Sequence, residues 1–334
     1  MVTMSPSEVI GWIVLLTICF IIFLNIWFKY TCMKCTSNVC LVGKTAVVTG
    51  GSLGIGHETV LSLLSRGCRV IIADRIITED IKKSIIHETK SSNFVLEYVD
   101  FASFQSVRDF VEKLNKTEEK IDILINNVGI GRCDGTCTED GLNRVMQINY
   151  YSPFLLTHLL IDLLKKSEEP KILFTSSILS FSHELLGKNV TEDNIIISNR
   201  LTTYFTSKFC TVVASDIFAK KLRKHNIKCN SYHPGAVKTN IFNESRKYMT
   251  LNVVDVITTF LGDLMIFVSG QTPKDASQTA VNIVVSEEYK NVTGEFIGMF
   301  LPSLKPRGSH DKIFCKKIWN ASEKLVKLQP NEKL

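Results

Sequence analysis

The residues of this chain best suited to proton transfer are a tyrosine and a lysine four positions apart, Tyr204 and Lys208. They fall in an amphipathic stretch, residues 201–225, that predicts a helix, so their side chains share one face. A nearby ammonium group stabilises a phenolate and lowers the pKa of a tyrosine from about 10 toward neutral pH. Such a phenol can act as general acid or base when a carbonyl and an alcohol interconvert. For an isolated pair of this spacing, an ordinary exposed helix face is the alternative.

Predicted strands on either side of this pair end in residues that suit the same chemistry. The strand before it ends in Ser176 and Ser177, and the strand after it ends in His233, Pro234 and Gly235. A serine hydroxyl can hydrogen-bond a substrate oxygen and stabilise the charge that develops there. The order of strand, helix and strand therefore favours an active site over an exposed helix face.

A glycine-rich loop follows the first predicted strand and opens a predicted helix. It consists of Thr49, Gly50, Gly51, Ser52, Leu53, Gly54, Ile55 and Gly56. Glycines allow a tight turn and a close approach of the backbone to a phosphate, and the helix N-terminus supplies oriented N–H groups. The spacing G-x3-G-x-G differs from the usual G-x-G-x-x-G fingerprint, so the loop by itself is consistent with a phosphate site or an ordinary turn.

An acidic residue, Asp74, ends the next apolar stretch, eighteen residues after Gly56. A carboxylate at this place can accept hydrogen bonds from the ribose of an adenine nucleotide. A helix N-cap or a solvated loop residue is the alternative. The succession of strand, glycine loop, helix and strand favours ribose binding.

Short apolar runs alternate with amphipathic stretches from residue 43 to residue 301. We predict strands at 46–48, 69–73, 94–99, 121–125, 171–175 and 227–232, separated by helices that include 55–65, 104–114, 141–166 and 201–225. Strands that are apolar throughout are typical of a parallel sheet covered on both faces. The pattern predicts a single α/β domain over residues 43–301, a Rossmann-type doubly wound parallel sheet.

These motifs resemble those of the short-chain dehydrogenase/reductase family. The glycine loop is similar to the family's TGxxxGxG signature, and Tyr204 with Lys208 is similar to its YxxxK pair. Further matches are Asp100, then Asn126, Asn127, Val128 and Gly129 for the family's NNAG, then Asn149, Ser177, Pro234, Gly235 and Thr239. Details at 138–141 and 154–160, with an apolar N-terminal run, resemble the membrane-anchored retinol dehydrogenase branch.

The resemblance implies a role for each matched residue. Tyr204 would exchange a proton with the substrate, Ser177 rather than Ser176 would hold the substrate oxygen, and Lys208 would also bind the nicotinamide ribose. Asn149 would hold an ordered water that connects Lys208 to solvent, and a buried asparagine at a local break in the backbone is a compatible alternative. The residues expected to bind the cofactor are Gly50, Gly51, Ser52, Leu53, Gly54, Ile55, Gly56, Asp74, Arg75, Asp100, Asn127, Gly129, Tyr204, Lys208, Pro234, Gly235 and Thr239.

The neighbouring residues Asp74 and Arg75 bear on the choice of cofactor. A carboxylate repels a 2′-phosphate and binds a 2′-hydroxyl, which favours NAD over NADP. Arg75 has the opposite preference, but the glycine loop contains no Lys or Arg to reinforce it. We therefore expect NAD. We expect no metal, because Cys32 and Cys35 have no second pair of ligands nearby.

Residues 10–28 form an apolar run without a charge. As a helix, its nineteen residues span roughly 28 Å, close to the hydrocarbon thickness of a bilayer. A cleaved signal peptide is the alternative, although its apolar stretch is normally shorter and follows positive charge. We expect a short tail at 1–9, a transmembrane anchor at 10–28 and a linker at 29–42. Lys29 and Lys34 favour a cytosolic catalytic domain, and the resemblance implies the endoplasmic reticulum.

Basic residues concentrate in the C-terminal segment, residues 302–334. It holds eight Lys and Arg against three Asp and Glu, which leaves 31 against 30 in the rest of the chain. A nearly neutral body argues against a nucleic-acid partner, which requires a broad basic face. Apolar residues of the segment form one helical stripe flanked by lysines: Phe314, Ile318, Ala321, Leu325 and Leu328. The stripe is typical of a helix on a membrane surface, and docking on the protein's own core is the alternative.

Residues 251–269 are apolar and lie where the family places its variable substrate lid. Asp255 and Asp263 make a second membrane span costly. An apolar lid suits a lipophilic alcohol or carbonyl compound such as a retinoid, a steroid, or a fatty or isoprenoid compound, and packing against the core is the alternative. We therefore predict a membrane-anchored oxidoreductase for such a substrate. An inactive nucleotide- or lipid-binding scaffold of the same fold is the competing function, and a homodimer is left open.

Overall fold

The computed structural model describes residues 5–30, 34–131, 133, 135–191, 194–195, 200–237, 246–247, 253–298 and 304–334. Within these residues, seven parallel strands form one sheet in the order β3-β2-β1-β4-β5-β6-β7. The strands are β1 (Thr45–Thr49), β2 (Arg69–Asp74), β3 (Phe94–Tyr98), β4 (Ile123–Asn126), β5 (Lys171–Thr175), β6 (Lys228–Tyr232) and β7 (Phe296–Ile297). The six predicted strands are confirmed. The edge strand β7 was not predicted, because two residues are too short to show a periodicity.

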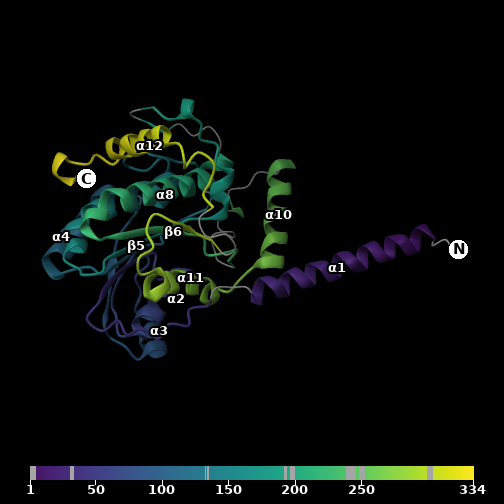
Figure 1. Ribbon diagram of the computed structural model, residues 1–334, viewed down its shortest axis with the longest axis horizontal. Coiled ribbons are helices and arrows are strands. Elements are labelled where there is room, and N and C mark those ends of the chain that lie inside the picture. Colours follow the sequence, from purple (N-terminus) through teal and green to yellow (C-terminus); the bar gives the residue numbers. More distant parts are fainter. Residues whose placement is uncertain are drawn as a thin grey trace.

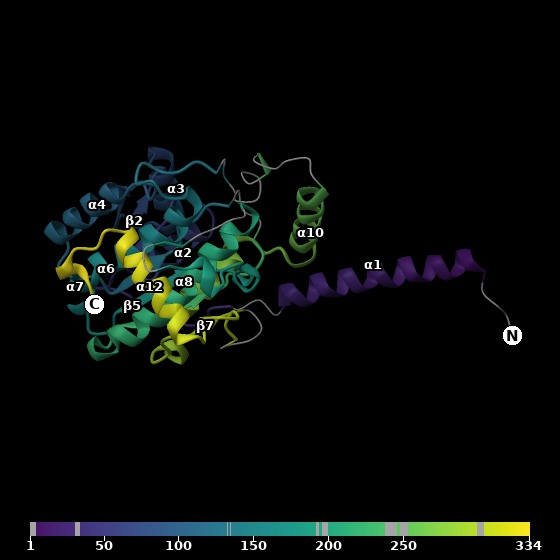
Figure 2. The ribbon, with the colours of Figure 1, turned by 90° about the horizontal axis from the view of Figure 1, so that it is seen from above.

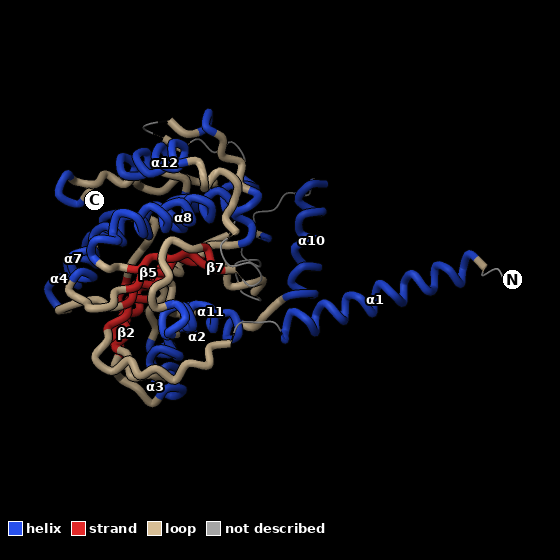
Figure 3. Tube along the Cα trace, in the orientation of Figure 1, coloured by secondary structure: helices blue, strands red, loops and turns tan. Residues whose placement is uncertain are grey.

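Helices cover both faces of the sheet, which confirms the doubly wound α/β fold (Figures 1 and 3). One layer contains α4 (Phe104–Thr117), α6 (Ser152–Leu159) and α8 (Arg200–Leu222), and the other contains α2 (Gly54–Leu64), α3 (Glu79–Thr89) and α11 (Pro273–Val285). Alternate residues of β1 show why the middle of this strand is apolar: Val47 packs in the first layer and Val48 in the second, and both are fully buried. Parallel strands enclosed in this way cannot carry a polar face.

The predicted helix 141–166 is divided in the structure into four short pieces. They are α5 (Arg144–Met146), a π-helical turn η1 (Gln147–Tyr151), α6 and α7 (Ile161–Lys165). Turns of π-helix inside helices are frequent at functional sites. Asn149, one of the predicted site residues, lies in this π-helical turn.

The N-terminal helix α1 (Pro6–Tyr30) extends away from the sheet and the helices that cover it (Figures 1 and 2). Many of its described apolar side chains, among them Leu16 and Phe20, are exposed. None of the described helices meets the length and hydropathy required to cross a membrane.

The C-terminal stripe packs on the protein's own core, and the membrane-surface interpretation of this stripe is therefore wrong. Helix α12 (Lys312–Leu325) lies over α8 in Figure 1, and Phe314, Ile318 and Ala321 are buried there. The hydroxyl groups of Tyr150 and Ser322 lie 2.8 Å apart beneath it. The end of the chain is also fastened, since Lys221 Nζ donates to the backbone oxygen of Leu334 over 2.8 Å.

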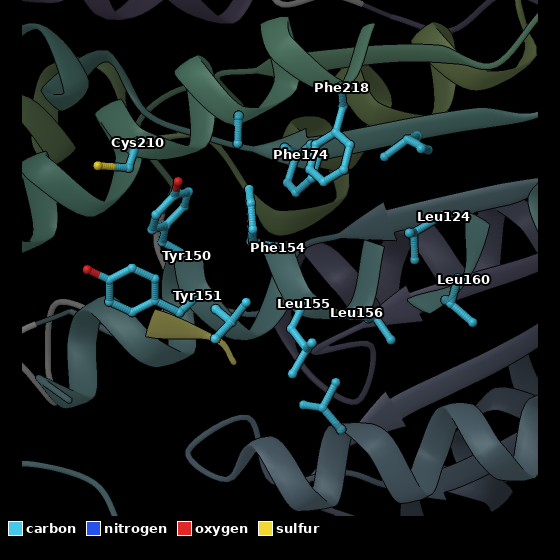
Figure 4. Close-up of a cluster of buried hydrophobic side chains, with 14 of the residues drawn as sticks. Leu124, Tyr150, Tyr151, Phe154, Leu155, Leu156, Leu160, Phe174, Cys210 and Phe218 are labelled. Atoms are coloured by element: carbon cyan, nitrogen blue, oxygen red, sulfur yellow. The ribbon is translucent and has the colours of Figure 1, made fainter. Parts of the chain in front are cut away.

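An aromatic cluster joins this helix to the first layer of the core. Figure 4 shows Phe154 between Tyr150 and Phe218, with ring centroids 5.8 Å and 5.5 Å away. The ring of His158 lies 4.4 Å from Phe154 and 5.2 Å from Trp319 of α12. Its Nε2 has no hydrogen-bond partner among the described residues, and burial lowers the pKa of His158 to about 4.

Because the imidazole of His158 is buried, we expect the fold to become less stable in acid. Between pH 4 and the ordinary histidine value of 6.5, the unfolded chain binds more protons than the folded chain, so the free energy of unfolding rises with pH. Over this pH range, His158 should change the free energy of unfolding by about 3 kcal/mol. We expect His158→Phe to flatten the rise in urea midpoint over this range. It should not abolish the rise, because burial also lowers the pKa of His233 to about 4. His87→Phe, at an exposed position on α3, is the control, and an equal slope in both variants would exclude this explanation.

Candidate active site

The predicted site residues gather at the carboxyl ends of the central strands. The strand order reverses between β1 and β4, since the chain passes from β1 through β2 to β3 on one side and continues with β4 on the other. In open α/β sheets, ligands bind outside the carboxyl ends of the strands at such a reversal. The glycine loop follows β1, Asn127 and Gly129 follow β4, and Ser177 follows β5.

The glycine loop folds too tightly for side chains at two of its glycines. Gly50 has φ +63°, a backbone conformation that favours glycine. A Cβ atom on Gly56 would lie 2.1 Å from the carbonyl oxygen of Gly50 and 2.6 Å from Nδ2 of Asn127. That amide nitrogen also donates to the carbonyl oxygens of Thr49 at 3.1 Å and Gly50 at 3.2 Å. Asn127 therefore holds the shape of the loop.

This loop fits the pyrophosphate of a dinucleotide. Helix α2 begins at Gly54, and its N-cap residue, Leu53, offers no side-chain hydrogen bond to the first turn. The first N–H groups of a helix have no partner within the helix, and they attract anions. A compact glycine turn that leads into such a helix is the usual cradle for a phosphate.

Asp74 lies at the end of β2 and fastens this loop. Its Oδ2 accepts a hydrogen bond from the backbone N–H of Ser52 at 3.0 Å, and its Oδ1 accepts one from the N–H of Ile76 at 3.1 Å. The alternative that Asp74 caps a helix is wrong, because Thr78 is the N-cap of α3. Each carboxylate oxygen retains a further lone pair, so the group can still accept from a ribose hydroxyl. Arg75 is exposed beside it.

The structure brings Tyr204, Lys208 and Ser177 together. Tyr204 and Lys208 occupy successive turns of α8, and the ammonium nitrogen of Lys208 lies 5.7 Å from the centre of the tyrosine ring. The phenol of Tyr204 lies close enough to Ser177, at the end of β5, for the serine to lower the pKa of the phenol. Ser176 has a structural role, as expected, since its hydroxyl donates to the carbonyl oxygen of Lys208 over 2.8 Å. Helix α8 and the end of β5 are thus in contact at the predicted site.

The expected lowering of the tyrosine pKa is not found. Burial raises the pKa of Tyr204 to about 12, and the nearby Ser177 side chain only partly offsets this. Burial also lowers the pKa of Lys208 to about 8. The Lys208 ammonium donates to the carbonyl oxygen of Thr175 at 2.8 Å, so its charge is directed at the strand end. At neutral pH the phenol of Tyr204 is therefore protonated in this structure.

Asn149 is held by the backbone of Ile130 and by one serine hydroxyl. Its Oδ1 accepts from the N–H of Ile130 at 2.8 Å, and its Nδ2 donates to the Ile130 carbonyl at 2.9 Å and to the Ser207 hydroxyl at 3.2 Å. This confirms the alternative of a buried asparagine at a break in the backbone. A Cβ atom on Gly129 would lie 3.4 Å from both Asn149 Oδ1 and Lys208 Nζ. The asparagine therefore adjoins Lys208, where the expected water would lie.

The remaining predicted residues lie around this centre. Asp100 follows β3 and its Oδ1 accepts from the N–H of Ala102 at 2.9 Å. Pro234 is buried after β6, and Gly235 has φ +91°, which favours glycine. Thr239 lies outside the described residues.

One residue that the motifs did not single out as functional is Thr49. Its hydroxyl accepts from the backbone N–H of Asn127 at 2.9 Å and of Val128 at 3.0 Å, so it joins the end of β1 to the segment after β4. The signal in the sequence was a polar residue at the end of an apolar strand. Such a residue must find a partner because it is buried.

Comparison with known families gives the identity of this site. The family described as short chain dehydrogenase matches residues 44–250, which include every motif named above. The chain belongs to the short-chain dehydrogenase/reductase family. It is an NAD(P)-dependent oxidoreductase of that family.

Relatives place this short-chain dehydrogenase/reductase with the retinol dehydrogenase branch. Retinol dehydrogenase 13 of Mus musculus is 30% identical over 88% of this chain and 87% of its own. Retinol dehydrogenase 14 of Mus musculus is 29% identical over 85% of this chain and 86% of its own.

Solved structures of the family share the fold. L-sorbose reductase from Gluconobacter frateurii, complexed with NADPH and L-sorbose, has a TM-score of 0.61 at 19% identity and covers 78% of this chain and 97% of its own. A short-chain dehydrogenase from Shigella flexneri, complexed with NADP, has a TM-score of 0.58 at 20% identity and covers 79% of this chain and 99% of its own. At these identities the likeness concerns the fold alone.

Proposed function

We propose that this enzyme is membrane-anchored and interconverts a lipophilic, retinol-like alcohol with its aldehyde or ketone. The observation that carries the proposal is the meeting of Ser177, Tyr204 and Lys208 at the strand ends beside the glycine loop. The retinol dehydrogenases that resemble the chain over most of its length support the class of substrate. The exposed apolar side chains of α1 support the anchor.

Each residue of the site has its own role in the proposed reaction. A bound nicotinamide would supply or accept the hydride. Ser177 holds the substrate oxygen, and Tyr204 donates a proton to that oxygen during reduction or accepts one from it during oxidation. Lys208 places positive charge 5.7 Å from the phenol ring, which stabilises phenolate once a proton has left. Gly129 leaves room beside Lys208 for the cofactor to approach.

A substrate panel tests this function. The full-length protein in phosphatidylcholine vesicles is assayed by NADH and NADPH oxidation with retinal, a long-chain aldehyde, a steroid ketone and propanal. We expect kcat/KM for at least one lipophilic substrate to exceed that for propanal by about a hundredfold, since roughly 3 kcal/mol comes from burial of its apolar chain. Preference for the steroid or the long-chain aldehyde would identify the alternative substrates. Cofactor binding without turnover of any compound would instead identify a scaffold.

We also propose that NAD is preferred to NADP. The Asp74 carboxylate is fixed by the N–H groups of Ser52 and Ile76, so it cannot easily turn away from a nearby 2′-phosphate. Removal of its charge should weaken that repulsion. We expect Asp74→Asn to raise the ratio of kcat/KM with NADP to that with NAD by about tenfold, which corresponds to roughly 1.4 kcal/mol. Asp80→Asn, at an exposed position on α3, is the control. A wild-type enzyme that prefers NADP would contradict the proposal.

The orientation in the membrane is part of the same proposal. Lys29 and Lys34 follow the apolar run, so the positive-inside rule favours a cytosolic catalytic domain. We propose the endoplasmic reticulum as its membrane, in keeping with the retinol dehydrogenase branch. Protease treatment of sealed microsomes should then digest the catalytic domain without detergent. Protection of the domain until detergent is added would reverse the orientation.

A further inference from the structure

Helix α1 forms hydrogen bonds with the helix that comes after β6 in the chain. Asn25 places a carboxamide near the C-terminal end of α1, and its Nδ2 donates to the carbonyl oxygens of Phe267 at 2.9 Å and Val268 at 3.2 Å. These carbonyls belong to the last turn of α10 (Val253–Ser269), where a helix leaves its carbonyl groups without intrahelical partners. The contact joins two segments more than two hundred residues apart in the chain.

The C-terminal end of α10 is tied to the cofactor site as well. After the helix, the backbone N–H of Gln271 donates to the carbonyl oxygen of Ala236 at 2.8 Å, and Gln271 forms a parallel bridge with Val237. Ala236 and Val237 directly follow Pro234 and Gly235 at the end of β6. The segment that directly follows α10 is therefore bonded to the backbone just after a strand end of the active site.

Helix α10 presents an apolar face to the outside. Val256, Ile257, Leu264 and Phe267 are exposed, Phe267 by 67%. At about 100° per residue, the four fall within roughly 100° of the helix circumference, while the half-buried Met265 and Ile266 lie on the opposite side. Asp263 is exposed at the edge of the apolar face, but its carboxylate is paired with Arg246.

Both helices expose apolar side chains, but they differ in direction. Helix α1 projects from the protein, and α10 runs across the direction of α1 at the point where α1 leaves the catalytic domain (Figures 1 and 2). An anchor that enters the bilayer along its own axis would hold a crosswise helix in the plane of the membrane surface. Amphipathic helices whose apolar face is exposed are able to bind in that plane.

We infer that α10 is a membrane-surface helix, that its apolar face contacts the acyl chains of the bilayer, and that Asn25 positions it there. A lipophilic substrate then passes from the bilayer along α10 to the strand ends without crossing bulk water. This inference rests on the proposed membrane anchor and substrate class. It assigns to α1 a role in substrate entry in addition to attachment.

Lipid contact can be measured without any activity. Benzoylphenylalanine replaces Phe267 in the full-length protein, which is reconstituted in phosphatidylcholine vesicles and irradiated. We expect a phospholipid adduct at this position and none when the same photoreactive residue replaces Ile313, an exposed apolar residue of α12. Equal labelling at both positions, no labelling at 267, or a crosslink from 267 to a second copy of the chain would overturn the inference. If the vesicles do not retain the protein at all, the anchor itself has failed.

The role of Asn25 is tested by Asn25→Leu, which keeps α1 apolar and removes both hydrogen bonds. We expect unchanged retention in vesicles, a KM for the lipophilic substrate raised about tenfold and an unchanged kcat, because uniform binding is lost and chemistry is not. KM for propanal should not change. Cys19→Leu, at an exposed position of the same helix, is the control. An unchanged KM in Asn25→Leu, or an equal change for both substrates, would show that Asn25 does not control entry from the membrane.

Discussion

Tyr204→Phe is expected to lower kcat by about a thousandfold, in the range that a positioned acid or base contributes. The substitution removes the hydroxyl near Ser177 and leaves the ring beside Lys208. Because phenylalanine keeps the shape of the site, cofactor affinity should change little. The measurement is kcat with saturating substrate, together with the dissociation constant of NADH from fluorescence. Tyr98→Phe, at an exposed end of β3, should have wild-type activity. Retention of activity in Tyr204→Phe would assign the proton transfer to another group.

The pH dependence should distinguish the two directions of this reaction. Alcohol oxidation requires the phenolate, and burial raises the pKa of Tyr204 to about 12, so the rate of oxidation should increase with pH across the range from 7 to 9. Carbonyl reduction requires the protonated phenol, which predominates throughout that range. An oxidation rate that is independent of pH would indicate that the bound cofactor brings the phenol's pKa below 7.

Gly56→Ala is expected to abolish cofactor binding and to destabilise the fold. The new Cβ atom would lie 2.1 Å from the Gly50 carbonyl oxygen and 2.6 Å from Asn127 Nδ2, and both are parts of the loop that must remain close together. Overpacking of this kind costs about 1–3 kcal/mol or more. Helix propensity by itself favours alanine over glycine by about 1 kcal/mol, so the expected loss of stability is opposite to the effect of propensity. The free energy of unfolding measures the destabilisation, and the NADH dissociation constant measures the loss of cofactor binding.

The matched control is another helical glycine, Gly262 of α10, which has nothing within 4 Å of the position of its Cβ. Gly262→Ala should keep or slightly increase stability and should bind NADH normally. If both variants bind NADH equally well, the glycine loop does not shape the cofactor site.

Local spacing was sufficient to predict the catalytic pair and the sheet. Tyr204 and Lys208 are four residues apart, so they share a face of any helix that contains them. The apolar runs that form β1 to β6 are long enough to be identified as strands in the sequence. The parallel arrangement then places all their carboxyl ends at one edge, which brings the glycine loop, Asn127 and Ser177 together. The two-residue strand β7 and the π-helical turn around Asn149 could not be predicted, because neither has a periodicity of its own.

The direction of the Tyr204 pKa shift required the structure. The sequence shows that a lysine is near, but the effect of that charge competes with desolvation, which depends on all the chain that surrounds the phenol. The hydrogen bond of Lys208 to the Thr175 carbonyl is equally invisible in the sequence, since it joins a helix to a strand.

The C-terminal stripe and α10 show the same difference between what the sequence predicts and what only the structure decides. An apolar stripe specifies only that a helix avoids water, and both a protein core and a bilayer satisfy it. The sequence by itself determined the family, the sheet and the identities of the chemical groups, because these follow from local patterns. Only the tertiary structure decided that α12 covers α8 while α10 remains exposed beside α1, because the partner of an apolar face is set by contacts between segments distant in the chain.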